Sequence, residues 1–115
     1  MLVIRQEQIA ALAAPSREGM KLRMRAQLQR YWAPLCEQLD ADGVASLIEH
    51  ALARCLHHGI GAENDQMRFL NAMALLGAGF DEEYAWARSC LANHNVRSAS
   101  RMDELCETIF RKVNS

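Results

Sequence analysis

Several features that mark membrane, secreted or disordered proteins are missing from this sequence of 115 residues. No apolar run approaches the roughly 18 residues that a membrane-spanning helix needs, so we expect no membrane association. The N-terminal stretch becomes charged at Arg5 and Glu7, which interrupts the apolar segment that a secretory signal peptide requires. Hydrophobic residues make up 50% of the chain, far too many for a disordered protein. A folded cytoplasmic protein is therefore expected.

Aromatic residues, prolines and runs of β-branched residues are also scarce, and the only strand-like stretch covers residues 2–4. Good helix formers such as Ala, Leu, Arg, Gln and Glu dominate instead. The length is close to that of a typical domain and suffices to bury a core without disulfides or metal. The sequence thus predicts an all-α fold, a compact bundle of five to six short helices that forms one domain over residues 1–115.

Breaker and capping residues place the expected helices. We expect helices over about 6–13 and 16–32, followed by a separate helical turn over 34–39. The next helix begins at Asp40 or Asp42 and ends before Gly59, and another covers about 62–76. A short helix runs from the acidic residues 81–83 to Leu91, and the last helix begins at Ser98 or Ser100. Apolar residues at helical spacing define the inward faces. Among the residues expected to face inward are Tyr31, Leu56, Phe110 and Val113.

Cysteine and histidine could indicate a metal site, because the chain has four of each. Only Cys90 and His94 have the spacing of paired metal ligands, and no second pair accompanies them. Cys55 and Cys106 lie on apolar stripes, where thiols behave as small hydrophobic groups. We therefore predict neither a metal nor another cofactor.

The sequence also lacks a recognisable catalytic arrangement. His57 and His58 end a predicted helix, where the helix dipole favours protonated imidazole and explains them without catalysis. The acidic residues 81–83 begin another predicted helix, where the positive end of the helix dipole favours carboxylates and explains them without a cation. No Ser/His/Asp set, nucleophile elbow or H-E-x-x-H motif is present, and residues 77–79 lack the third glycine of a dinucleotide loop. We predict a protein that is not an enzyme and has no catalytic residue.

The net charge of −1 conceals three blocks of opposite sign. Residues 1–36 carry +4, residues 37–83 carry −7 and residues 84–115 carry +2. These blocks fit either solvated faces that attract each other or a basic helix that docks an acidic partner or nucleic acid. The helices on either side of residues 59–61 superficially match a helix-turn-helix. Glu63 and Asp65 would oppose the phosphate backbone there, so we expect no nucleic-acid partner.

Short motifs along most of the chain carry a resemblance to a known family. They comprise Gly59–Ile60, the acids at 63 and 65, residues 68–73, Leu76–Gly77, Phe80–Asp81, Trp86–Ala87, Leu91, residues 100–102, residues 4–8 and the segment around Pro34. With these motifs the chain resembles small proteins encoded beside spike-tip (VgrG and PAAR) and effector genes of bacterial type VI secretion systems. That family often has prolines where this chain has the shorter segment 81–85. The resemblance implies an accessory role in loading or stabilising a secreted effector, together with a larger effector chaperone.

We therefore expect a non-enzymatic adaptor or co-chaperone whose partner is an effector, an effector chaperone or a spike-tip protein. Aromatic and basic side chains are the usual anchors of protein interfaces. The candidates for partner binding are Arg17, Lys21, Arg23, Arg25, Trp32, Phe80, Tyr84 and Trp86. Core packing remains the alternative for each aromatic residue, and a solvated face remains the alternative for each basic one. An immunity protein that neutralises a cognate toxin is the alternative function, because the acidic block would suit a basic nuclease. The oligomeric state stays open.

Overall fold

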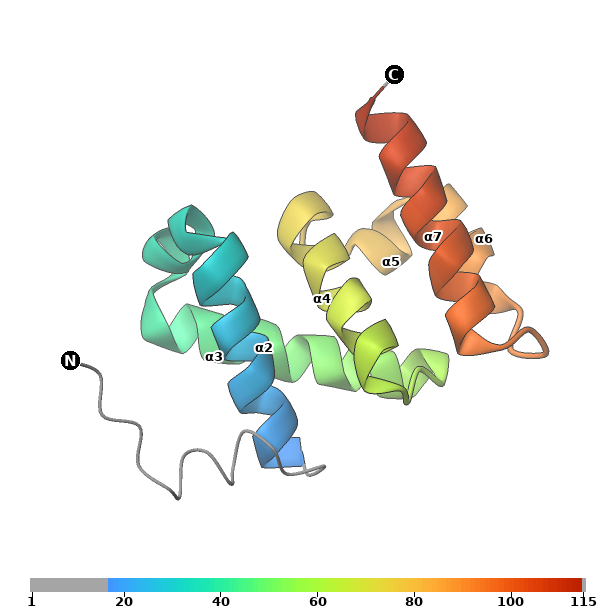
Figure 1. Ribbon diagram of the computed structural model, residues 1–115. Helices are drawn as coiled ribbons and strands as arrows, with labels where there is room; N and C mark the ends of the chain where they lie inside the picture. Colours follow the sequence, from blue (N-terminus) through green and yellow to red (C-terminus); the bar gives the residue numbers. More distant parts are fainter. Residues whose placement is uncertain (1–16, 115) are drawn as a thin grey trace. The chain divides into compact units, whose positions relative to one another are not determined.

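The computed structural model describes residues 17–114, and within that range it contains helices and no strand (Figure 1). The helices are α2 (Arg17–Tyr31), α3 (Ala33–His58), α4 (Glu63–Leu76), α5 (Phe80–Glu83), α6 (Ala85–Ala92) and α7 (Ser98–Val113). The predicted all-α class is thereby confirmed. The helix expected over residues 6–13 lies outside the described residues.

Internal contacts divide the chain into two compact units, residues 1–48 and residues 49–115, with the boundary inside α3. The first unit contains α2 and the beginning of α3. The second contains the end of α3 and helices α4 to α7. A single domain over residues 1–115 stays a prediction.

In the first unit, α2 buries one stripe of side chains, as its sequence spacing predicts. Met20, Met24 and Leu28 are each at most 5% exposed, and they recur every fourth residue. Tyr31 was expected on the same face but is 60% exposed, because it sits in the last turn of α2. The prediction that Tyr31 faces inward is wrong.

Helix α3 changes direction at Asp40, whose φ of 60° and ψ of −178° are not helical. The Asp40 Oδ1 accepts a hydrogen bond from the backbone N–H of Gly43 at 2.9 Å, which makes Asp40 the N-cap of the following helical stretch. Of the two predicted caps, the structure selects Asp40 over Asp42. The separate turn expected over residues 34–39 is confirmed by the same break.

In the second unit, α3 ends in a Schellman motif. The N–H of Ile60 donates to the carbonyl of Cys55 at 2.8 Å, and the N–H of Gly59 donates to the carbonyl of Leu56 at 3.2 Å. Gly59 has a φ of 69°, which glycine adopts without steric cost, so its predicted position just after the helix is confirmed. The Leu56 side chain is 82% exposed, because it lies about 100° around the helix from the buried Cys55. The inward assignment of Leu56 is wrong.

The core of the second unit lies among α4, α5, α6 and α7. Helix α4 contacts α5 and α7, while α6 contacts α5 and α7, and α4 and α7 run in the same direction (Figure 1). The ring centroids of Phe69 and Phe80 are 5.1 Å apart. Large side chains buried here at less than 2% exposure include Phe69, Phe80, Leu70, Leu91, Met102 and Leu105. This core positions the polar residues of the candidate site.

Two predicted boundaries in this unit are wrong. The helix expected over residues 81–91 is interrupted at Tyr84, which is extended at φ −100° and ψ 123° and separates α5 from α6. Neither Ser98 nor Ser100 caps α7, because its N-cap position is Arg97 and no side chain bonds there. The Ser98 hydroxyl instead donates a hydrogen bond to Asp65 Oδ2 at 3.2 Å, so it joins α7 to α4.

Helix α7 extends beyond the core at its C-terminal end. Exposure rises along one face in steps of four residues, from 0% at Leu105 to 9% at Ile109 and 58% at Val113. Phe110 lies about 100° around the helix from Ile109 and is 69% exposed. The predicted inward positions of Phe110 and Val113 are therefore wrong, and two large apolar side chains remain on the surface.

Candidate functional site

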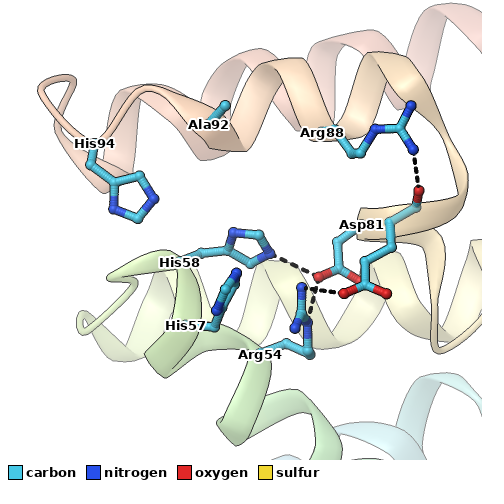
Figure 2. Close-up of a pocket in the computed structure, with 8 residues that line it drawn as sticks. Arg54, His57, His58, Asp81, Arg88, Ala92 and His94 are labelled. Atoms are coloured by element: carbon cyan, nitrogen blue, oxygen red, sulfur yellow. Dashed lines mark hydrogen bonds and ion pairs between the residues drawn. The ribbon is translucent and has the colours of Figure 1, made fainter.

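A pocket of about 300 Å³ opens in the second unit, where the end of α3 faces α5, α6 and the loop after α6 (Figure 2). Its lining residues are Arg54, His57, His58, Asp81, Glu82, Arg88, Ala92 and His94. Almost all of these side chains are ionisable, so the electrostatics of the pocket determine what chemistry it can support.

Asp81 is the central group of the pocket, and it is only 2% exposed. Its Oδ2 accepts hydrogen bonds from Arg54 Nε at 2.6 Å and from His58 Nε2 at 2.8 Å (Figure 2). Since an ionised carboxylate can only accept, the hydrogen of the His58 ring resides on Nε2. The Arg54 Nη2 also pairs with Glu82 Oε1 at 3.2 Å. These contacts fasten α3 to α5.

Burial and hydrogen bonding have opposing effects on the pKa values of Asp81 and His58. Burial alone would raise the pKa of Asp81, but hydrogen bonds from His58 and Arg54 outweigh it and hold the pKa below its usual range. Burial also lowers the pKa of His58, and the favourable contact with Asp81 only partly offsets that effect. Asp81 is thus ionised and His58 neutral at pH 7. The expectation that the helix dipole keeps His58 protonated is wrong, because desolvation is the stronger effect.

A neutral histidine held by a carboxylate can act as a base toward a group that enters the pocket. None of the eight lining residues carries a hydroxyl or thiol group. Cys55 is near in sequence, yet it is buried and burial raises its pKa to about 12, so its thiol stays protonated. Among the described residues, no three His, Cys, Asp or Glu side chains are grouped so as to hold a metal ion. The observed contacts of Asp81 with Arg54 and His58 tie α5 to α3.

Arg101 forms a second polar centre, at the ends of α3 and α6, and is only 4% exposed. Its Nη1 donates to the carbonyl oxygens of His58 at 2.8 Å and Leu91 at 3.0 Å, and its Nε donates to the carbonyl of Val96 at 3.1 Å. His58 and Leu91 lie in the last turns of α3 and α6, where carbonyl groups have no partner within the helix. One guanidinium on α7 thus satisfies the ends of two other helices.

A third set of polar contacts ties α4 to α7. Arg68 donates to Asp65 and to Asp103, both at 2.6 Å, and Ser98 donates to the second oxygen of Asp65. Hydrogen bonds to Asp103 and Asp65 raise the pKa of Arg68 further above its already high value. Asp65 was interpreted as a complement to the helix dipole, and the structure adds that it is a buried ion-pair partner.

The predicted partner-binding residues do not form one cluster. Arg17, Lys21, Arg23, Arg25 and Trp32 belong to the first unit, where Lys21 pairs with Glu18 at 3.2 Å. Trp32 follows α2 directly and is half-buried.

The other three candidates belong to the second unit. The rings of Tyr84 and Trp86 stack at 5.6 Å, and the Lys112 ammonium lies 5.3 Å from the Trp86 ring. Phe80 is fully buried against Phe69, so it has no surface to offer a partner. This placement corrects the expectation for Phe80, which belongs to the core.

Sequence reasoning missed Arg54, His58, Asp81 and Arg101 as parts of the polar centres. Asp81 and Arg101 do occur within the short motifs of the resemblance. Their position beside the buried Phe80 and Met102 does not distinguish them, because Asp103 also adjoins Met102 and is exposed. No local feature of the sequence separates a buried, paired charge from an exposed one.

Stability of the second unit is expected to fall as the solution is acidified from pH 7 to pH 5. The folded state lowers the pKa of His58 below 6.5, so the unfolded chain binds its proton first and unfolding becomes easier below that pH. One proton contributes a slope of at most about 1.4 kcal/mol per pH unit. Urea denaturation of the full chain at each pH measures that slope.

The control for this slope is a pair of substitutions at adjacent histidines. His58→Gln should flatten the dependence, whereas His57→Gln should retain most of it, because burial is the largest cause of the lowered pKa of His58 and the charge of His57 is the smallest. Equal slopes in the wild type and in His58→Gln would contradict the assignment. Asp81 acts at lower pH, because its lowered pKa contributes stability that is lost only as pH falls below about 4.

Comparisons with protein-family models, curated proteins and solved structures find no match for this chain. None of the described helices is both long enough and apolar enough to cross a lipid bilayer.

Proposed function

We propose that this protein is a non-enzymatic adaptor or co-chaperone that binds an effector, or its larger chaperone, in the cytoplasm for type VI secretion. The observation that carries this proposal is the number of large apolar side chains left exposed. Among the described residues these are Leu22, Tyr31, Leu56, Leu75, Val96, Phe110 and Val113. Phe110 and Val113 are three residues apart near the end of α7, and exposed apolar side chains that share one helix face are expected at protein-binding sites.

The polar residues favour the same view, because they are engaged within the protein. Asp81 is bound by Arg54 and His58, and Arg101 is bound by three backbone carbonyls. Arg68 on α4 is held by two carboxylates, so it has little to offer a nucleic-acid phosphate. The buried charged groups thus stabilise the helix arrangement, and we expect a partner protein to bind exposed side chains.

Residues that carry the family resemblance also have structural roles. Gly59 and Ile60 form the Schellman motif, Asp81 ties α5 to α3, and Arg101 joins three segments. If these residues are what the family shares, then it shares a scaffold whose surface can be adapted to different partners. A secretion accessory protein that serves a particular effector would need this combination.

The direct test is co-purification of the tagged full chain with the products of its neighbouring genes, followed by a secretion assay. An adaptor should form a stable complex with an effector or chaperone, and its deletion should reduce secretion of that effector by about tenfold or more while other effectors are unaffected. Absence of any complex, together with normal secretion, would contradict the proposal.

An immunity protein remains the second candidate because of the acidic block over residues 37–83. Its exposed carboxylates are Glu37, Asp40 and Asp42 in the first unit and Glu49, Glu63, Glu82 and Glu83 in the second. They could complement a basic toxin and speed its capture. Expression of the chain would then protect cells from the cognate toxin, whereas an adaptor gives no protection. A toxicity rescue assay distinguishes the two functions.

A further inference from the structure

The pocket of the second unit contains two acceptor atoms to which no described residue donates. The Asp81 side chain is 1% exposed, and its Oδ1 is buried without a hydrogen-bond partner. His58 donates from Nε2 to the other oxygen of Asp81, so its Nδ1 carries a lone pair that no described donor meets. An acceptor without a donor costs free energy when it is buried, so a ligand that brings donors to this place would gain affinity.

Arg88 brings a positive charge to the same pocket. Its Nη1 donates to the backbone carbonyl of Glu82 at 2.6 Å, which places the guanidinium beside α5 (Figure 2). The side chain is exposed, and no carboxylate of the described residues forms an ion pair with it. The other N–H groups of the guanidinium can therefore donate to an anionic group of a ligand.

Two carboxylates and two guanidinium groups line the pocket, so their formal charges cancel. The carboxylates belong to Asp81 and Glu82, and Arg54 pairs with them at 2.6 Å and 3.2 Å. Arg101 does not line the pocket, and three backbone carbonyls hold its guanidinium. A simple anion would meet the Glu82 carboxylate, and a simple cation would meet Arg88. A zwitterion, which presents one charge to each, avoids both conflicts.

We propose that this pocket binds a free α-amino acid, a property that does not depend on the adaptor function proposed above. The ammonium group would donate to His58 Nδ1 and lie toward the carboxylates of α5, and the carboxylate would accept from Arg88. Both groups of the ligand are bonded to one carbon, and their partners are also neighbours, because Arg88 contacts the backbone of Glu82, the residue after Asp81. The volume of about 300 Å³ is at the lower end for ligand pockets and suits a small molecule.

The opposite end of the pocket would receive the side chain of the amino acid. His94 lies there, away from Arg88, and the His57 ring stands beside His58 at a centroid distance of 4.9 Å (Figure 2). An imidazole nitrogen can donate or accept a hydrogen bond, and Ala92 is the one lining residue with an apolar side chain. The lining therefore favours an amino acid whose side chain is small or polar.

Titration of the isotope-labelled full chain, followed by nuclear magnetic resonance, tests the proposal. The probes are L-alanine, L-serine and L-glutamine, and the tightest of them should shift amides of residues 54–58, 81–83 and 88–94. Its amide derivative lacks the carboxylate and its N-acetyl derivative lacks the ammonium group, so each should bind at least about tenfold more weakly.

The same derivatives identify other ligands. Equal binding of the amide would assign the pocket to the amino terminus of a polypeptide. Equal binding of the N-acetyl derivative would assign it to a carboxylate alone. Either result would overturn the proposal, and so would the absence of shifts with all three amino acids.

Substitution of Arg88 tests the carboxylate end of the site. Arg88→Gln should weaken binding of the amino acid by about tenfold and remove its preference over the amide, because the amide has no carboxylate to bind. Arg97→Gln, at an exposed arginine outside the pocket, should change neither. A purely structural role of Arg88 would weaken the amino acid and its amide equally, which would overturn the proposal. Thermal melting shows whether each variant is folded.

Glu82→Gln tests the ammonium end at a side chain that is 73% exposed, so the variant should fold. It should weaken binding of the amino acid by about threefold or more and reduce its preference over the N-acetyl derivative. Glu83→Gln is the matched control, since Glu83 is also exposed on α5 but does not line the pocket. An unchanged preference in Glu82→Gln would contradict the proposed position of the ammonium group.

Discussion

Replacement of Arg101 by alanine is expected to lower the free energy of unfolding by about 4 kcal/mol. The guanidinium makes three hydrogen bonds to backbone carbonyls at 2.8–3.1 Å, and its removal leaves the buried carbonyls of His58 and Leu91 without this donor. A hydrogen bond that involves a charged group contributes roughly 1.5–3 kcal/mol. The loss is a large fraction of the roughly 5–15 kcal/mol by which native proteins are stable. Urea denaturation of the full chain, followed by circular dichroism, measures it.

Arg97→Ala is the matched control, because Arg97 precedes α7 and is exposed. This substitution should change the free energy of unfolding by no more than about 0.5 kcal/mol. Arg101→Lys should recover only part of the loss, since one ammonium cannot reproduce the planar arrangement of guanidinium donors. An Arg101→Ala variant as stable as Arg97→Ala would show that the carbonyls find other partners.

Helix positions in the second unit could largely be predicted, because they depend on local chemistry. Gly59 ends α3 where only a left-handed residue fits, and the spacing of Met102, Leu105 and Ile109 defines the buried face of α7. Local rules were insufficient at Tyr84, where the chain leaves one helix and enters the next without proline or glycine. That break is a property of how the surrounding helices pack.

The polar centres could not be predicted, since their partners are far apart in sequence. Asp81 and His58 are 23 residues apart, and Arg101 and His58 are 43 apart. The spacing of residues along one helix does not predict which residues of two different helices will contact each other. The exposure of Phe110 and Val113 was missed for a related reason, because periodicity shows that they share a face of the helix without showing whether anything covers it.

Replacement of Asp81 by alanine is expected to cost about 3 kcal/mol of unfolding free energy. The substitution leaves the Arg54 side chain, 18% exposed, and the buried His58 without their common acceptor. Removal of one partner from a buried ion pair is strongly destabilising, because the remaining charge stays desolvated. Urea denaturation at pH 7, where Asp81 is ionised, measures the loss.

Asp81→Asn separates the contribution of charge from that of hydrogen bonding. The amide oxygen can still accept from Arg54 and His58 in the place of Oδ2, so the variant should lose only about 1–2 kcal/mol. Its amino group would occupy the place of Oδ1, which is buried and has no hydrogen-bond partner. Glu82→Ala is the control, since the Glu82 side chain is 73% exposed and its contact with Arg54 should contribute less than about 1 kcal/mol.

A double substitution decides whether the loss at Asp81 acts through Arg54, which then keeps only its contact with the exposed Glu82. Arg54→Met combined with Asp81→Ala removes the guanidinium that has lost its buried acceptor, so the double variant should be more stable than the sum of the two single losses predicts, by about 1–2 kcal/mol. Strict additivity would mean that Arg54 relaxes into solvent once Asp81 is gone. The stability of α5 against α3 would then come from the core around Phe80, and the buried carboxylate would contribute specificity of helix pairing more than stability.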